Sequence, residues 1–275
     1  MPTTFHVITP CRNAEPRLRE TVESVLSQTA VVSGRARLSY TVVDGASTDR
    51  SAEVVRGFGS DRIRWISEPD AGMYDALAKG LRLARPPGVC CYINAGDLYA
   101  KGAFDVVLDL FEKKAARWLT GMRVSYNDRS QVVSASLPFR YHRSLIEAGL
   151  YGRCLPFIQQ ESTFWDASLN DRLDLGKLAG FKLAGDFYLW KTFAEVSDLA
   201  IVEAFLGGFR VHPGQLSEAR ARYLAELDAI ARAPSLAERL LAQAERGLWH
   251  APGRVKKWFN PKGLYRFDHG AQDWR

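Results

Sequence analysis

Three acidic residues near the amino terminus, Asp44, Asp70 and Asp97, each come shortly after an apolar segment of strand length. Pro10 and Arg12 follow a fourth segment of this kind. In open α/β sheets the carboxyl ends of the parallel strands meet at one edge, and ligands bind there. Converging carboxylates repel one another unless a cation lies among them, and Mg²⁺ or Mn²⁺ bridging to a diphosphate meets this need. The pattern therefore predicts a site for a metal ion and a diphosphate.

Simpler functions for the same residues stay open. The sequence Asn94-Ala95-Gly96-Asp97 also suits an ordinary turn, and Asp44 and Asp49 are suitable residues to cap the helix expected near Ser51. The chain has neither a G-x-G-x-x-G nor a G-x-x-x-x-G-K-[ST] sequence. The two common glycine-rich phosphate cradles are therefore not predicted.

Strands and helices alternate in the first hundred residues. Apolar runs typical of strands lie at 5–9, 38–43, 63–66 and 89–93. Amphipathic helices are expected after each of them; the first places Leu18, Val22 and Val25 on one face. The alternation predicts an α/β fold with a mostly parallel, Rossmann-like sheet flanked by helices.

Composition limits the class of protein. The 275 residues carry 47% hydrophobic residues and a formal net charge of +6, which indicates a globular protein with an anionic partner such as a nucleotide or a phospholipid surface. The four cysteines form no CxxC pair and are expected to be reduced thiols, which fits a cytoplasmic protein. No signal peptide and no run long enough for a membrane span is visible. The basic residues do not form a known nucleic-acid-binding module, and no nucleic-acid partner is predicted.

Five motifs occur in an order that resembles family 2 glycosyltransferases, which have the GT-A fold, of the kind that builds bacterial surface polysaccharides. The similarity covers residues 4–217. The motifs are Thr9-Pro10-Cys11-Arg12-Asn13, Ser24-Val25-Leu26-Ser27-Gln28, Val43-Asp44-Gly45-Ala46-Ser47-Thr48-Asp49, the segment 67–80 and Asn94-Ala95-Gly96-Asp97.

The resemblance implies a nucleotide-sugar donor, by default a UDP-sugar. Asp44 would contact the base, with Pro10 and Arg12 nearby. Asp70 would lie by the base, ribose or diphosphate. Asp75, Lys79 and Asn94 would line the same pocket.

The metal motif departs from the family pattern. Asn94 stands at the first acid of the usual acid-x-acid sequence, so only Asp97 remains as a strong ligand for Mn²⁺ or Mg²⁺. Gly45 stands where many relatives carry another aspartate. Metal binding would therefore depend more on the phosphates of the donor.

The resemblance also implies a catalytic base. In the family the acid of a Gly-Asp pair at the start of a helix has this function, which selects Asp186; Glu161 is the rival base or an acceptor-binding residue. Transfer with inversion needs a carboxylate on the face of the anomeric carbon opposite the leaving diphosphate. A structural function for Asp186, as an acid favoured at a helix amino terminus, stays open.

Residues 207–217 look like the closing loop of the family. Arg210 and His212 would reach the diphosphate or the metal ion, and the flanking glycines would let the loop fold over the donor. A purely structural function for His212 is the alternative.

We expect a GT-A domain at 1–217, divided into a nucleotide-binding half (1–100) and an acceptor half (101–217), followed by a helical and basic-aromatic extension at 218–275. Aromatic and cationic residues alternate in 249–275, which suits peripheral attachment to an anionic membrane, on its cytoplasmic face. Packing of this tail on its own domain or on another subunit is the alternative.

The sequence thus predicts a glycosyltransferase of the hexosyltransferase type, acting on a glycan or lipid-linked acceptor. A sugar nucleotidyltransferase would share the sheet, but the glycine-rich, basic loop typical of that class is not found. A non-catalytic scaffold that kept the nucleotide-binding fold is the third hypothesis. The sugar, the acceptor and the linkage are not specified by the sequence.

Overall fold

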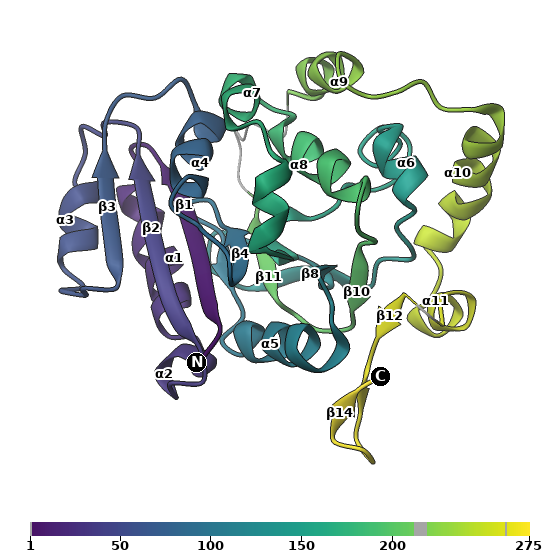
Figure 1. Cartoon of the computed structure of the whole chain (residues 1–275), viewed down its shortest axis with the longest axis horizontal. Helices are drawn as coiled ribbons and strands as arrows, with labels where there is room; N and C mark the ends of the chain where they lie inside the picture. Colours follow the sequence, from purple (N-terminus) through teal and green to yellow (C-terminus); the bar gives the residue numbers. More distant parts are fainter. Residues whose placement is uncertain (1, 212–218, 262) are drawn as a thin grey trace.

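The protein is described by a computed structural model for residues 2–211, 219–261 and 263–275. One large sheet runs through the middle of the molecule (Figure 1). Its strand order is β12-β10-β6-β9-β4-β1-β2-β3. The strands are β1 (Thr4–Cys11), β2 (Arg37–Asp44), β3 (Ile63–Ser67), β4 (Val89–Tyr92), β6 (Trp118–Thr120), β9 (Thr163–Asp166), β10 (Ala200–Val202) and β12 (Leu264–Tyr265).

The sheet is mostly parallel, as predicted. β1 pairs in parallel with β2 and β4, and β2 with β3, so that the carboxyl ends of these four strands meet at one edge. β9 is the exception, because it runs antiparallel to both β4 and β6. The expected α/β architecture is confirmed.

Helices cover both faces of this sheet, and each face has its own hydrophobic core. One core contains Leu18, Val22 and Val25 from α1 against Phe5 and other sheet residues. The other contains residues of α4, α6 and α8. The helices on the first face are α1 (Glu15–Leu26), α2 (Thr29–Val32), α3 (Ser51–Arg56) and α5 (Ala103–Lys114); those on the second are α4 (Met73–Leu81), α6 (Arg143–Glu147), α7 (Leu175–Gly180) and α8 (Gly185–Ala194).

A second sheet has the order β5-β11-β7-β8. It consists of β5 (Leu98–Tyr99), β11 (Gly207–Arg210), β7 (Arg123–Tyr126) and β8 (Val132–Ser136). β6 and β7 are close in sequence but belong to different sheets: β6 joins the large sheet, and β7, after the turn at Gly121, joins the small one. β7 pairs antiparallel with β8 in a hairpin.

The carboxyl-terminal residues contain α9 (Arg220–Asp228), α10 (Leu236–Trp249) and α11 (Gly253–Phe259), followed by β12 and the small hairpin of β13 (Phe267–Asp268) and β14 (Asp273–Trp274). Ser235 and Glu238 form a capping box that begins α10. β12 pairs with β10, so this part of the chain extends the large sheet. The division into domains at 217 and 218 stays a prediction.

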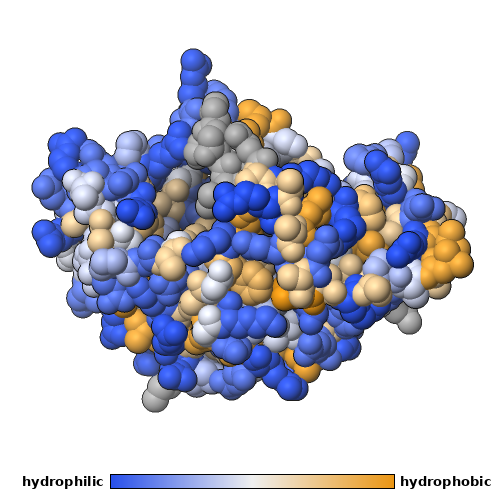
Figure 2. Space-filling view, turned by 90° about the horizontal axis from the view of Figure 1, so that it is seen from above, coloured by the Kyte–Doolittle hydropathy of each residue, from blue (hydrophilic) through white to orange (hydrophobic). Residues whose placement is uncertain are grey.

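The tail mixes buried and exposed aromatic residues. Trp249 is buried and packs edge-on against Tyr141 and Tyr151, as expected for a tail packed on its own domain. Trp258 has 77% of its surface exposed, and Phe259 beside it is also exposed. Figure 2 shows a largely hydrophilic surface, with apolar side chains gathered at the end of the molecule that α10 forms. Among the helices described, none is long and apolar enough to cross a membrane.

Candidate functional site

A cavity of about 770 Å³ opens at the edge where the parallel strands end. One wall comes from the loops that follow β1, β3 and β4. The other comes from the small sheet, from the first turn of α8 and from α9. The described residues that line it include Pro10, Arg12, Asp70, Asn94, Asp97, Glu161, Asp186 and Arg210, all predicted from sequence.

Asp70 reaches the cavity through space that Gly45 leaves open. A Cβ atom built on Gly45 would lie 2.4 Å from Oδ2 of Asp70. The glycine that departs from the family pattern is therefore required by the position of Asp70. Asp70 also accepts a hydrogen bond from the backbone N–H of Gly72, which holds the loop before α4.

Three residues expected at the donor site are not among those that line the cavity. Asp44 is buried and accepts hydrogen bonds from the N–H of Ser47 (3.0 Å) and the hydroxyl of Ser67 (2.6 Å). Asp75 accepts from the N–H of Ala71 (3.0 Å).

Lys79 is the third of these residues. Its Nζ donates to the carbonyl of Pro69 (3.0 Å) and pairs with Glu68 (2.9 Å). The expectation that Asp75 and Lys79 line the pocket is therefore corrected, because both side chains bond from α4 to the loop before it. Together with Asp44 they fix the loop that presents Asp70.

The turn at Asn94-Ala95-Gly96-Asp97 is held from α1. Thr21 accepts a hydrogen bond from the N–H of Gly96 (2.8 Å) and donates one to the carbonyl of Asp97 (2.9 Å). Gly96 has φ +113°, a conformation that glycine adopts without strain. The turn places Asp97 at the cavity, although only 5% of the surface of this residue is exposed.

Arg210 forms hydrogen bonds to this turn. Its backbone N–H donates to Oδ1 of Asp97 (2.8 Å), and its Nε donates to the carbonyl of Gly96 (2.7 Å). The guanidinium also bonds to the carbonyls of Asn127 and Asp128 and pairs with Glu20. Arg210 also lines the cavity, and the expectation that it reaches the diphosphate stays a prediction. The predicted closing loop begins as strand β11, and His212 lies outside the described residues.

The residues present fit a metal ion only in combination with a ligand. Within the described ranges, no group of three or more His, Cys, Asp and Glu side chains forms a metal site. However, Oδ1 of Asn94 is buried and has no hydrogen-bond partner among the described residues, and Asn94 lines the same cavity as Asp97. An amide oxygen and a carboxylate are hard ligands of the kind that Mg²⁺ and Mn²⁺ prefer. Two protein oxygens leave most of the coordination to water and phosphate.

Glu161 lies next to Asp97, and both are buried. Burial raises the pKa of Glu161 to about 7, and repulsion from Asp186 contributes. Burial also raises the pKa of Asp97, with repulsion from Glu161 as the second cause. A Cβ atom on Gly207 would lie 2.1 Å from the backbone oxygen of Glu161, so only glycine permits this packing of β11.

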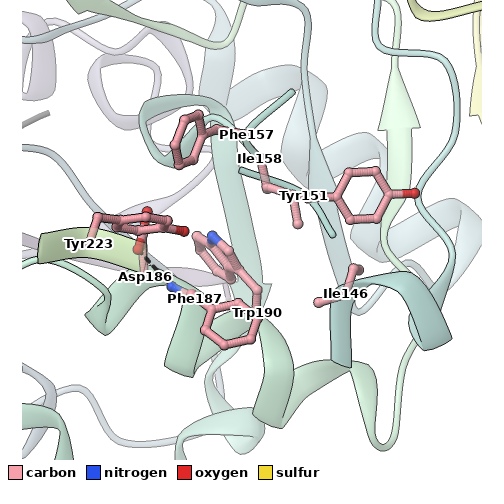
Figure 3. A pocket seen from close by; sticks show the side chains of 8 residues that line it. All are labelled: Ile146, Tyr151, Phe157, Ile158, Asp186, Phe187, Trp190 and Tyr223. Atoms are coloured by element: carbon pink, nitrogen blue, oxygen red, sulfur yellow. Dashed lines mark hydrogen bonds between the residues drawn. The ribbon is translucent and has the colours of Figure 1, made fainter. Parts of the chain in front are cut away.

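Asp186 lies in the first turn of α8 and accepts a hydrogen bond from the N–H of Phe187 (2.7 Å). Figure 3 shows it facing Tyr223 and Trp190 in a small pocket beside the main cavity. Burial raises the pKa of Asp186 to about 6, with a lesser contribution from the charge of Glu226. A carboxylate with such a pKa can accept a proton near neutral pH.

α9 completes this part of the site, and sequence reasoning missed it. The Glu226 carboxylate accepts hydrogen bonds from the backbone N–H groups of Lys182, Leu183 and Ala184, at 2.9 to 3.2 Å. These are the residues just before α8. Glu226 thus acts as a cap for the helix that carries Asp186, although it lies more than forty positions further along the chain.

Comparison with known proteins agrees with the motifs. Residues 6–162 match the family model described as "Glycosyl transferase family 2". Two curated proteins from Mycobacterium tuberculosis strains, each named "Uncharacterized glycosyltransferase", are 37% identical over 78 residues. This match spans only 28% of the chain and 28% of each relative.

Solved structures show the same GT-A fold at low identity. Staphylococcus aureus TarS in complex with UDP-GlcNAc has a TM-score of 0.60 at 14% identity, covering 93% of this chain and 83% of that one. The mannosyltransferase PcManGT from Pyrobaculum calidifontis, in complex with GDP-Man and Mn²⁺, has a TM-score of 0.56 at 18% identity, covering 94% and 72%. At such identities the likeness concerns the fold alone.

Proposed function

The chain belongs to glycosyl transferase family 2, and from this premise we propose that it transfers a sugar from a nucleotide-sugar donor to a hydroxyl group of a glycan or lipid-linked acceptor. The observation that carries the proposal is the 770 Å³ cavity, which joins the carboxyl ends of β1 and β4 to a buried acid with a pKa of about 6. UDP-GlcNAc in one structural neighbour and GDP-Man with Mn²⁺ in another support a nucleoside diphosphate sugar. Cell-surface polysaccharide synthesis is the process that we propose for it.

Asp186 is the proposed base. Its carboxylate takes the proton of the acceptor hydroxyl while the oxygen forms a bond to the anomeric carbon of the donor sugar. The bond between that carbon and the diphosphate breaks, and its electron pair leaves with the diphosphate. Attack from the side opposite the leaving group inverts the configuration. Glu161, which is buried beside Asp97, remains the rival base to be tested.

Asp97 and Asn94 are the residues that would hold Mn²⁺ or Mg²⁺. The ion would supply positive charge to the departing diphosphate. Arg210 keeps Asp97 in place through the bond from its backbone N–H. Pro10, Arg12 and Asp70 line the wall on which we place the nucleotide.

We also propose that the protein is cytoplasmic and attaches peripherally to the inner face of an anionic membrane. Trp258 and Phe259 expose large aromatic surfaces on α11, beside the cation of Arg254. Replacement of both aromatic residues by serine is expected to lower co-sedimentation with phosphatidylglycerol vesicles several-fold. Equal sedimentation of the variant and the original protein would contradict this attachment.

A thermal-shift panel tests the donor site. The protein is heated with UDP, GDP, CDP or dTDP, with and without Mn²⁺, together with Asp97→Asn and the exposed control Asp61→Asn. A ligand that binds only the folded state raises the unfolding temperature by mass action. We expect one nucleotide to stabilise the protein more strongly with Mn²⁺, and the metal-dependent part to be lost in Asp97→Asn alone. No shift with any nucleotide would favour a non-catalytic scaffold.

A further inference from the structure

The β7–β8 hairpin presents a row of hydrogen-bond donors to the cavity. Arg123 pairs with Ser136 across the hairpin, and Ser125 pairs with Ser134. Residues two positions apart on a strand share a face, so all four side chains lie on the same face of the hairpin. All four line the cavity.

These donors are not used within the part of the chain that the structure describes. There the Arg123 guanidinium has no ion pair or hydrogen-bond partner, and the hydroxyls of Ser125, Ser134 and Ser136 have none either. Ser130 in the same hairpin differs, because it donates to Glu20 at 2.6 Å. One guanidinium and three hydroxyls therefore face the cavity with their hydrogen-bonding capacity unfilled.

A second cation lies behind this wall. Lys256 of α11 is only 4% exposed, and its Nζ donates to the carbonyl of Leu137 (2.6 Å), the residue after β8. Among the described residues no carboxylate pairs with it. Burial lowers the pKa of Lys256, and the nearby charge of Arg123 contributes. Lys256 is not among the residues that line the cavity, so it adds positive charge behind the wall, while Arg123 is the cation at the cavity surface.

Acidic and basic side chains lie on different walls of the cavity. Asp70 and Asp97 lie on the side formed by the ends of the parallel strands, where we place the donor, and Asp186 lies at the amino terminus of α8. Arg123 and the serines come from the small sheet. On the donor side a metal ion would neutralise a negative group. On the hairpin side the Arg123 guanidinium can bind a carboxylate or phosphate through two hydrogen bonds.

We propose that Arg123, Ser125, Ser134 and Ser136 form a subsite for an oxyanion carried by the acceptor, a carboxylate or a phosphate group on the saccharide that receives the sugar. This inference rests on the proposed transfer function. The same cavity holds Asp186, so an acceptor fixed by its anion on the hairpin would have a hydroxyl within the space that the base reaches.

The experiment measures acceptor binding while the donor site is filled. Nucleoside diphosphate and Mn²⁺ are first added to saturation, which itself reports whether the proposed donor site exists. Methyl glucoside, methyl glucuronide and glucose 6-phosphate are then titrated by calorimetry. The first probe is neutral, and the other two separate a carboxylate from a phosphate as the anion recognised.

The original protein is expected to bind at least one anionic probe about 10-fold more tightly than the neutral one, the size expected for a charge-assisted bond. Arg123→Ala should abolish this preference, whereas Arg123→Lys should keep part of it. Arg64→Ala, on the exposed part of β3, should bind like the original protein. The double variant Ser134→Ala, Ser136→Ala leaves the guanidinium in place and should lower the preference for anionic over neutral probes several-fold.

Two results separate the failure of this inference from that of the transfer function. If no nucleoside diphosphate binds, the proposed function fails. If the nucleotide binds but neutral and anionic probes bind equally, or if Arg123→Ala keeps the preference, the oxyanion subsite is overturned while the donor site stands. Unchanged unfolding midpoints in the variants show that the fold is retained.

Discussion

Glu226 offers the sharpest test of how α9 supports the site. Its Oε2 atom accepts hydrogen bonds from the N–H groups of Leu183 and Ala184, both at 2.9 Å, and it shares that of Lys182 with Oε1. Ala184 is fully buried and Leu183 is half-buried, so water cannot easily replace the carboxylate there. Lys182 is exposed, and its N–H can bond to solvent instead.

The expected loss of stability follows from the two hydrogen bonds to Leu183 and Ala184, which are shielded from water. A hydrogen bond to a charged group contributes about 1.5 kcal/mol or more, so Glu226→Ala should lower the free energy of unfolding by about 3 kcal/mol. In a chain of this size that corresponds to a fall of about 6 to 12 °C in the unfolding temperature. Asp228→Ala removes an exposed carboxylate from the same helix, where it pairs with Arg153, and should cost less than about 1 kcal/mol.

Glu226→Gln keeps the hydrogen-bond acceptor that caps α8 and removes its negative charge. The amide oxygen can take the place of Oε2 and keep the bonds to Leu183 and Ala184, so about 1 kcal/mol of stability should be lost. The negative charge of Glu226 is one cause of the raised pKa of Asp186, after burial. Its removal should lower that pKa and move the acid limb of the pH–rate profile to lower pH.

The assays are chemical denaturation for stability and the pH dependence of nucleoside diphosphate release for the base. Other groups that act on Asp186 stay in place in both variants: Tyr74 from α4, Glu161, and Tyr223 from α9. The reasoning is refuted if Glu226→Ala is as stable as Asp228→Ala, or if Glu226→Gln leaves the pH profile unchanged.

Three further predictions follow from buried groups. Asp186→Asn should stabilise the protein by about 3 kcal/mol at pH 8 in urea titrations. The pKa of Asp186 is about 6 in the folded state and 3.8 in the unfolded state, so ionisation favours unfolding, fully so above pH 6. The gain should vanish near pH 4, where the folded-state carboxyl group is protonated. Gly45→Ala should displace Asp70, cost about 1 to 3 kcal/mol in the same titrations and weaken nucleotide binding measured by calorimetry. Arg210→Ala should cost about 1.5 to 3 kcal/mol and weaken Mn²⁺ binding, because the carbonyl of Gly96 in the Asp97 turn loses its charged donor. The ion pair with Glu20 adds less, since that side chain is 44% exposed. Unchanged stability or metal affinity would contradict this role.

The sequence predicts those parts of the fold that depend on neighbouring residues. The alternating apolar runs place the strands that end near Pro10, Asp70 and Asp97, and all three line one cavity. The Gly-Asp pair that opens a helix predicts the position of Asp186 at the start of α8. These features follow from short-range periodicity and from turn-forming residues.

The rest depends on contacts between distant residues. Arg210 pairs with Glu20, which lies 190 positions away, and no local sequence pattern predicts that pair. The same holds for Glu226 and the start of α8. The stretch 118–126 is divided between two sheets at Gly121, where a Cβ atom would lie 2.8 Å from the backbone of Ala204, a contact that only the tertiary structure reveals.

The most direct test of the account is the rate at which the protein releases nucleoside diphosphate from its nucleotide sugar in the presence of acceptor. The original protein, Asp186→Asn and Glu161→Gln are compared at pH 7.5, with donor affinity measured separately. The account predicts that Asp186→Asn binds the donor normally but turns over about 10² to 10⁴ times more slowly, the contribution of a general base. Turnover at the original rate in Asp186→Asn, or such a loss in Glu161→Gln alone, would contradict it.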